Sequence, residues 1–181
     1  DDIIVGTPTA GRSKTEFEKI VGYFINPVSI RADFSENPAV KDFISQIRKK
    51  VLGALSNQDF PFALLVERMH RKRDPVRSTI FQTFFGMQRI QHDDVLQEMI
   101  VPGNKGARTQ WGKLFLESYE ITQQEGQFEI TLEVVEGKNL FSGAFKYNTD
   151  LFKAETIKKM IVHFKNLLYD IVSDSKNSNI W

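Results

Sequence analysis

Two kinds of apolar periodicity alternate along this chain, and they restrict its fold more than any other feature of the sequence. In residues 28–34 apolar and polar side chains alternate, which is the period of a strand with one buried face. Residues 79–87 are nearly continuously apolar and aromatic, which is typical of a central strand covered on both faces. Further strands are predicted over residues 3–5, 114–121, 128–135 and 140–147.

Apolar residues recur at helical spacing in four segments. Ser13 and Glu16 have the spacing of a capping box and predict a helix that includes residues 17–24. Asn37 and Pro38 suit an N-cap and a first helical position, in front of an apolar stripe that runs to residue 55. Two more helices are predicted over residues 61–69 and 157–171.

The resulting order is strand, helix, strand, two helices, four strands and a final helix. Helices that are apolar on one side, beside a sheet of mixed direction, predict an α/β fold: a two-layer sandwich with one contiguous core. Residues 89–112 are predicted to form a long loop of the kind that is usually functional or mobile. Residues 136–139 predict a hairpin connection, and residues 174–181 predict a linker or tail.

The composition of the 181 residues, 41% apolar and 26% charged, is that of one ordinary globular domain. The absence of cysteine excludes disulfides, thiolate metal sites and cysteine nucleophiles; it fits a reducing compartment, so we expect a cytoplasmic protein. With 24 basic and 23 acidic residues the net charge is +1, which favours neither nucleic acid nor an anionic membrane as a partner. No apolar run in the sequence is long enough to span a bilayer.

The first residues, Asp-Asp-Ile-Ile-Val-Gly, lack an initiator Met, and residues 3–5 already have the pattern of a buried strand. A natural N-terminus more often begins with loose polar residues. We therefore expect the chain to derive from a longer polypeptide, and the alternative is a shortened small protein.

The residue patterns of common catalytic sites are missing. His70, His92 and His163 have no metal-ligand partner at helical or hairpin spacing, and we expect no metal site. Residues 6–12 lie between a strand and a predicted helix, as a phosphate loop would, but they lack the Gly-Lys-Ser/Thr ending. A structural turn is favoured there, which leaves Arg12 free to serve an interface.

Two charged segments have a functional and a simpler interpretation. The basic residues 71–77 could bind phosphates, but they include an aspartate and lack aromatic neighbours, so a solvated helix end is favoured. Glu129, Thr131 and Glu133 share one face of a predicted strand and could form an acid–base pair, whereas a solvent-facing sheet edge explains them more simply. Residue patterns alone therefore predict an α/β domain without an assigned function.

Five segments in order resemble those of nonribosomal peptide synthetase condensation domains. VGYFINPVSIR (residues 21–31) resembles the fifth core motif, NQDFPF (57–62) the sixth, and RDPVR followed by IFQ (73–82) the seventh. VGTPTAGR (5–12) and YNTDLF (147–152) also resemble segments that are usual in this family. Because these segments cover nearly the whole chain, it is identified as similar to the C-terminal lobe of such a domain.

The resemblance implies one lobe of a pseudo-dimer related to chloramphenicol acetyltransferase and other CoA-dependent acyltransferases. In the complete family enzyme, an N-terminal lobe with a His-His-x-x-x-Asp-Gly motif faces this lobe across a tunnel. An amide forms there between thioesters on the phosphopantetheine arms of a donor and an acceptor carrier protein. This chain has no adjacent pair of histidines. The resemblance therefore implies that residues 1–181 supply a tunnel wall, part of the acceptor side and carrier-protein contacts, are inactive alone, and hold no covalent cofactor.

The same resemblance sorts the motif residues into two groups. Asn26, Arg77, Asp74, Thr7 and Thr9 are candidates for positions beside the tunnel, although Asn26 also suits a helix C-cap, and Asp74 with Arg77 an ion pair. The remaining motif residues are expected to be structural, with Asp59 capping the helix that begins at Pro61. This structural group is Gly22, Phe24, Arg31, Gln58, Asp59, Pro61 and Phe62.

Two other functions stay open beside amide formation: a non-catalytic module that docks carrier proteins, and an acyltransferase lobe that uses a soluble CoA thioester. Residues 89–112 are a candidate element between the two lobes. The isolated lobe is also a candidate homodimer through its exposed inter-lobe face, which would include some of the 15 phenylalanines.

Overall fold

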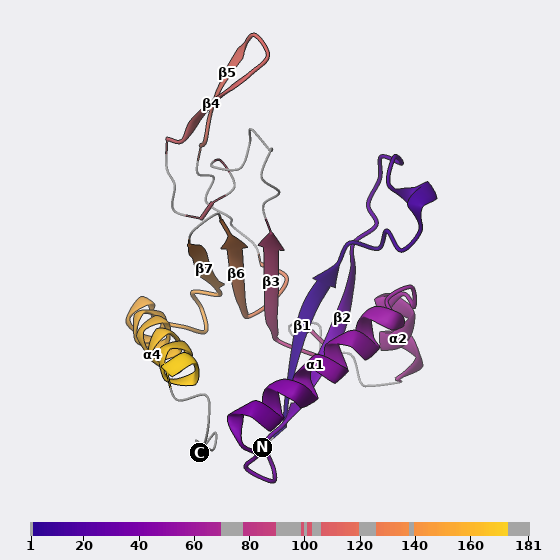
Figure 1. Cartoon of the computed structure of the whole chain (residues 1–181), viewed down its shortest axis with the longest axis vertical. Helices are drawn as coiled ribbons and strands as arrows, with labels where there is room; N and C mark the ends of the chain where they lie inside the picture. Colours follow the sequence, from indigo (N-terminus) through magenta and orange to yellow (C-terminus); the bar gives the residue numbers. More distant parts are fainter. Residues whose placement is uncertain are drawn as a thin grey trace.

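A five-stranded sheet forms the centre of the computed structural model, with helices and one separate hairpin extending from it (Figure 1). The structure describes residues 2–69, 78–89, 99, 101–102, 106–119, 126–137 and 140–173. The strands of the sheet are β1 (Asp2–Thr9), β2 (Asn26–Asp33), β3 (Thr83–Arg89), β6 (Ile130–Glu136) and β7 (Phe141–Tyr147). The other elements are η1 (Thr15–Phe17), α1 (Val40–Ser56), α2 (Phe62–Arg68), β4 (Arg108–Trp111), β5 (Leu114–Glu117) and α4 (Ala154–Ser173).

The sheet, in the order β2-β1-β3-β6-β7, is parallel in the middle and antiparallel at both edges. In the central strand, Thr83 is aligned with Val5 of β1 on one side and with Ile130 of β6 on the other. Parallel neighbours need a long crossover, and β2, α1 and α2 lie within the connection from β1 to β3. This mixed sheet with its helices confirms the predicted α/β sandwich.

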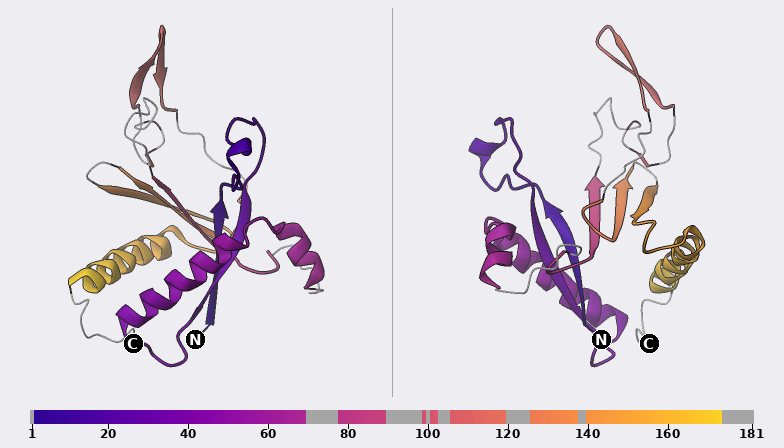
Figure 2. Two further views of the ribbon diagram at one scale, coloured as in Figure 1. Left: turned by 45° about the vertical axis from the view of Figure 1, so that its right-hand side comes forward. Right: turned by 180° about the vertical axis from the view of Figure 1, so that it is seen from behind.

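The two long helices lie on the same side of the sheet, α1 toward the β1–β2 edge and α4 toward the β6–β7 edge (Figure 2). The stacked rings of Phe34 and Phe43, with centroids 4.5 Å apart, join the end of β2 to α1. The edge-to-face rings of Phe145 and Phe164, 6.0 Å apart, join β7 to α4. Each helix therefore covers one edge of the sheet with part of the apolar stripe that its sequence predicts, since Leu52 on α1 and Leu167 on α4 are each 54% exposed.

A cluster of aromatic rings holds α2 against the central strands. Phe81 is fully buried, and its ring centroid lies 5.3 Å from that of Phe62, 6.1 Å from Phe84 and 5.3 Å from Phe128. Gly6 of β1 faces the same ring so closely that an added Cβ would overlap it. The cluster thus joins α2, β1, β3 and the residues that lead into β6.

The prediction of a helix over residues 17–24 is wrong. A single turn of 3-10 helix, η1, takes its place. The antiparallel pairing of β1 with β2 begins at Thr9 and Asn26 and continues to Asp2 and Asp33. Residues 10–25 therefore close a hairpin, which we call the β1–β2 loop. The rings of Phe17 and Phe24 pack on each other at 5.7 Å within this loop, and this contact replaces the predicted packing on a common core.

The predicted start of α1 is also wrong. The N-cap position is Ala39, and no side chain caps the helix. Asn37 instead has a φ of 42°, and its N–H donates to the carbonyl of Phe34, so that it closes a turn before the helix. A proline disfavours helical geometry in the residue before it, which agrees with this later start.

Most of the predicted strands are confirmed, with shifted ends. β3 begins at Thr83, four residues later than expected. Met87 is 49% exposed, so the prediction of a strand covered on both faces along residues 79–87 is wrong. β4 lies within the predicted loop 89–112 and pairs with β5 in a separate two-stranded sheet. The predicted hairpin of β6 and β7 and the final helix are both present.

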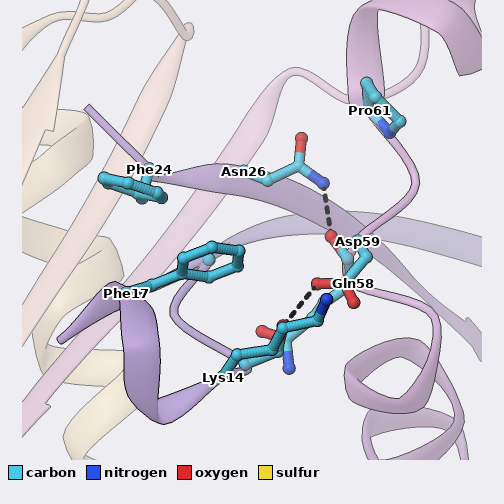
Figure 3. Close-up of a pocket in the computed structure, with 9 residues that line it drawn as sticks. Lys14, Phe17, Phe24, Asn26, Gln58, Asp59 and Pro61 are labelled. Atoms are coloured by element: carbon cyan, nitrogen blue, oxygen red, sulfur yellow. Dashed lines mark hydrogen bonds between the residues drawn. The ribbon is translucent and has the colours of Figure 1, made fainter. Parts of the chain in front are cut away.

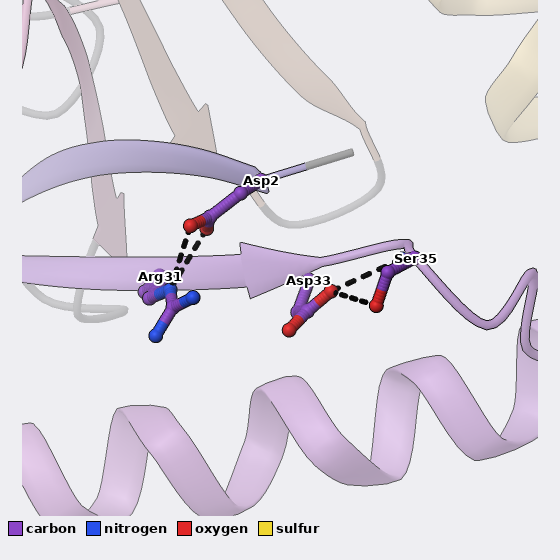
Figure 4. A network of polar contacts seen from close by, with 4 residues as sticks. All are labelled: Asp2, Arg31, Asp33 and Ser35. Carbon is purple, nitrogen blue, oxygen red and sulfur yellow. Dashed lines mark hydrogen bonds and ion pairs between the residues drawn. The ribbon is translucent and has the colours of Figure 1, made fainter.

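Arg31 ties β2 to the first residue of β1 (Figure 4). Its Nε donates to both carboxylate oxygens of Asp2 at 2.9 Å. This hydrogen bond lowers the pKa of Asp2 and raises that of Arg31, while hydrogen bonds from Ser35 lower the pKa of Asp33. Lowered carboxyl pKa values stabilise the fold above the unfolded pKa and lose this effect as pH falls through the folded pKa. These groups are exposed, so the effect is small.

We expect Gly6→Ala to destabilise the domain by about 2–3 kcal/mol, because its methyl group would overlap the ring of the buried Phe81. Urea unfolding of the domain that contains this chain measures the change. Gly86→Ala is the matched control in β3, since the nearest atom to its added Cβ is 3.9 Å away. Equal losses in the two variants would contradict the close contact between Gly6 and Phe81.

Candidate functional site

A pocket of about 460 Å³ opens between the β1–β2 loop and the turn that joins α1 to α2 (Figure 3). Two phenylalanine rings and a proline supply apolar wall, and hydroxyl, amide, carboxylate and ammonium groups supply polar wall. The lining residues are Gly11, Ser13, Lys14, Phe17, Phe24, Asn26, Gln58, Asp59 and Pro61. Six of these nine lie in the motif segments 5–12, 21–31 and 57–62, so the fold brings together parts of three motifs that are far apart in the sequence.

Asn26 joins two of those motifs directly, in an arrangement that we call the Asn26 clasp. Its Nδ2 donates to the carbonyls of Gln58 and Phe60 at 2.8 Å each, and its Oδ1 accepts the N–H of Phe62 at 3.0 Å. Asn26 is the first residue of β2, so the alternative that it ends a helix as a C-cap is wrong. Both amide hydrogens and the amide oxygen are used, and the side chain fixes the 58–62 turn onto the sheet.

Asp59 does not cap α2, contrary to the expectation. The N-cap position is Pro61, without a side-chain hydrogen bond of its own, and Asn26 satisfies the N–H of Phe62 from the neighbouring strand. Asp59 instead accepts a hydrogen bond from the hydroxyl of Ser13 at 2.9 Å. A second link therefore joins the β1–β2 loop to the same turn.

Arg12 is not free to serve an interface. Its guanidinium lies 4.3 Å from the centroid of the Phe24 ring, and it donates hydrogen bonds to the carbonyls of Phe17 and Gly22. Gly11 has a φ of +63°, and a Cβ there would overlap the carbonyl oxygen of Phe24. The two residues hold the β1–β2 loop closed from inside, which fixes one wall of the pocket.

The two threonines of β1 lie beside this site. Thr9 is 5% exposed, and its hydroxyl donates to the carbonyl of Asn26 at 2.8 Å. Thr7 pairs with Val28, two residues along β1 from the Thr9–Asn26 pair. Neither threonine is among the residues that line the pocket.

The RDPVR part of the seventh motif, with Asp74 and Arg77, lies outside the described residues, as do His70, His92 and the tail 174–181, whereas its IFQ part is described and contains the buried Phe81. His163 is an exposed residue of α4. Glu133 pairs with Lys146 of β7 at 2.8 Å, but β6 lies between β3 and β7, so the prediction of a sheet edge there is wrong. Within the described ranges no group of three His, Cys, Asp or Glu side chains could hold a metal ion, and no helix could cross a membrane.

Sequence reasoning missed the hairpin of β4 and β5, which projects from the body of the domain (Figure 1). Trp111, Leu114 and Phe115 near its tip are 61%, 61% and 82% exposed. A 2.9 Å ion pair between Arg108 and Glu117 closes its base. The sequence does hold a signal for this hairpin. The Gly-Lys pair at 112–113 lies between two apolar residues and suits a two-residue hairpin turn. Lys14 and Phe17 of the pocket had no such signal, because only the closure of the β1–β2 loop brings them there.

Known proteins share both the sequence and this architecture. The family model of the condensation domain matches residues 1–179. A linear gramicidin synthase polypeptide from Brevibacillus parabrevis is 35% identical over 98% of this chain and 3% of that protein. Surfactin synthase subunit 1 from Bacillus subtilis (strain 168) is 35% identical over 96% of this chain and 4% of that protein.

A solved structure agrees with these relatives. Holo-AB3403, a four-domain nonribosomal peptide synthetase bound to AMP and glycine, superimposes with a TM-score of 0.89 at 29% identity, over 97% of this chain and 14% of that one. The chain thus spans a small part of each relative's length. Since the family model covers nearly all of its residues and the motif segments meet around one pocket, the chain belongs to the condensation-domain family of nonribosomal peptide synthetases.

Proposed function

We propose that this chain is the C-terminal lobe of a condensation domain that forms an amide bond between two thioesters carried by carrier proteins. The observation that carries the proposal is the meeting of the fifth and sixth motifs at the Asn26 clasp, on the wall of an amphipathic pocket. The catalytic His-His-x-x-x-Asp-Gly motif would lie in an N-terminal lobe outside these 181 residues, since the three histidines here are far apart in the sequence.

The proposed reaction is an acyl transfer to nitrogen. The α-amine on the acceptor arm attacks the thioester carbonyl on the donor arm, a C–N bond forms, and the C–S bond breaks. The thiol leaves on the donor arm, and the amine proton passes to the imidazole of the N-terminal lobe and then to the thiolate. Holding two tethered reactants in line supplies much of the rate gain, and polar groups near the tetrahedral centre add to it.

The residues of this chain would act as a wall and a guide. Phe17, Phe24 and Pro61 offer apolar surface, and Ser13 and Gln58 offer hydrogen bonds, which suits an arm that alternates methylene and amide groups. The threonines Thr7 and Thr9 would stand beside the wall at the end of β1. Asp74 and Arg77 remain proposed tunnel residues from the family resemblance alone.

The β4–β5 hairpin is the proposed bridge to the N-terminal lobe. It carries large apolar side chains that are more than half exposed, and such a surface marks a site that another protein surface covers. Its two strands pair only with each other among the described residues, so the hairpin reaches away from the sheet. A crossing element of this kind would hold the two lobes at a fixed separation.

Amide formation by the complete condensation domain is the direct test. With loaded donor and acceptor carrier proteins, we expect one amide product on the acceptor arm and a free thiol on the donor arm, measured by mass spectrometry of the intact carriers. This chain alone should give no product, and turnover by it alone would contradict its dependence on the other lobe.

The same assay separates the two rival functions. Equal rates with a soluble CoA thioester in place of the donor carrier would indicate the acyltransferase alternative. Carrier binding without any amide product would indicate the docking module.

A change in the hairpin tests the proposed bridge. The ring of Phe115 is 82% exposed in this chain, so Phe115→Ala should be neutral unless another surface covers the ring. We expect it to lower the unfolding free energy of the complete domain by about 1–2 kcal/mol, measured by denaturant unfolding. Lys113→Ala in the turn of the same hairpin is the control, and equal small changes in both variants would exclude the bridge.

Asn26→Asp separates the clasp from a role beside the reacting groups. The variant keeps the acceptor for the Phe62 N–H but sets a carboxylate oxygen against the carbonyls of Gln58 and Phe60. We expect the unfolding free energy to fall by about 2 kcal/mol. The kcat of the still-folded domain, measured at low temperature, should change less than threefold.

Phe60→Leu is the control, because Phe60 contributes its main-chain carbonyl to the clasp and its side chain is not among the residues that line the pocket. A loss of kcat of tenfold or more in folded Asn26→Asp would instead assign Asn26 to the reaction chamber.

A further inference from the structure

The β1–β2 loop has a small interior of its own, apart from the core of the sheet. Of residues 10–25, all of which the structure describes, four are half-buried and the rest are exposed. The four are Gly11, Arg12, Phe17 and Phe24. Taking an arginine out of water costs free energy unless polar groups surround it. The half-buried Arg12 therefore indicates that its guanidinium has a specific place in the loop.

The guanidinium of Arg12 joins three parts of the loop. It donates through Nη1 to the carbonyl of Phe17 and through Nη2 to the carbonyl of Gly22 at 3.5 Å. The ring of Phe24 lies against it, with 4.3 Å between Cζ and the ring centroid. In the described part of the chain no carboxylate forms an ion pair with Arg12. Main-chain oxygens and an aromatic face of the loop itself therefore hold this cation, which suits the planar, forked guanidinium.

Arg12 is connected to the pocket through two of these partners. It is not among the lining residues, whereas Phe17 and Phe24 are. Their rings lie next to each other in Figure 3, with centroids 5.7 Å apart. Because the guanidinium contacts the ring of Phe24 and the main chain of Phe17, its position fixes where both rings stand in the pocket wall.

A change in the shape of this loop does not require the domain to unfold. None of residues 10–25 belongs to the aromatic cluster around Phe81. Large side chains on the outside of the loop are exposed, since Val21 is fully exposed and Tyr23 is 84% exposed. Segments with little buried apolar surface rearrange at a small cost in free energy while the rest of a domain stays folded. A fault in the loop should therefore show in binding before it shows in stability.

We propose that Arg12 is a positioning residue for amide formation: it holds Phe17 and Phe24 in the orientation in which they bind one of the two phosphopantetheine arms. This inference rests on the proposed function, in which the pocket is part of the wall along an arm. The rings contact a part of the arm that does not react, so they bind the ground state and the transition state equally. Loss of such an interaction raises KM and leaves kcat unchanged.

Arg12→Met in the complete condensation domain is the test. Methionine keeps a long, flexible side chain that can pack on Phe24, but it lacks the charge and the donors. With loaded donor and acceptor carrier proteins, we expect KM for one carrier to rise about fivefold, while KM for the other carrier and kcat change less than about twofold. Initial rates at varied concentrations of each carrier, followed by mass spectrometry of the intact carriers, measure all three values.

Arg68→Met is the matched control. The guanidinium of Arg68 lies 5.5 Å from the ring centroid of Phe60, which is a contact of the same kind, and neither residue lines the pocket. The three kinetic values of this variant should stay within about twofold of those of the unaltered domain. Arg12→Lys restores a cation beside Phe24 without the fork that reaches two carbonyls, so its KM should rise less than that of Arg12→Met.

The outcomes separate this inference from the proposed function. If the unaltered domain forms no amide, both fail. If it forms the amide and Arg12→Met raises both KM values equally, lowers kcat with KM unchanged, or leaves all three values unchanged, the inference alone is wrong. Arg12→Met that does not fold, or that melts at a clearly lower temperature with unchanged KM values, gives Arg12 a structural role and likewise excludes the positioning role.

Discussion

The buried ring of Phe81 is the contact on which the rest of this structure depends. It is fully buried among Phe62, Phe84 and Phe128, and the missing side chain of Gly6 gives it the room it needs on β1. Close packing of this kind tolerates little change in volume. Through Phe62 the cluster fixes α2, and α2 begins at the residue whose N–H the Asn26 clasp satisfies. The pocket wall is therefore held by an aromatic contact on one side and by amide hydrogen bonds on the other.

Little else in the described part of the chain is packed as tightly. Large apolar side chains on the β4–β5 hairpin, on α1 and on α4 are exposed to solvent in this chain. A monomeric domain rarely leaves so much apolar surface in water. This distribution agrees with the proposed function, in which another surface covers part of this chain.

The sequence predicted the frame of the fold because periodicity is a local signal. The strands β2, β6 and β7 and the helix α4 were found within a few residues of their ends, since each shows its buried face in its own residues. The capping box at Ser13 failed for the opposite reason. Its residues suit a helix locally, but the pairing of Thr9 with Asn26 closes residues 10–25 into a loop, and tertiary contacts decide the outcome.

The sequence motifs predicted which residues belong to the site, but they did not predict the contacts between those residues. Phe24, Asn26, Gln58, Asp59 and Pro61 were singled out from the resemblance, and the fold gathers them around one pocket. The hydrogen-bond partners were wrong for Asn26 and Asp59, because each side chain reaches across more than thirty residues, to the 58–62 turn and to Ser13. No local pattern encodes such contacts.

The Asn26 clasp also explains why the pocket wall does not depend on the chemistry of the side chains in the 58–62 turn. The clasp holds the wall through main-chain carbonyls of Gln58 and Phe60 and the main-chain N–H of Phe62, so it does not depend on those three side chains. The side chain of the lining residue Gln58 is then open to exchange without loss of the frame. A wall fixed by backbone hydrogen bonds keeps its shape whatever side chains line it.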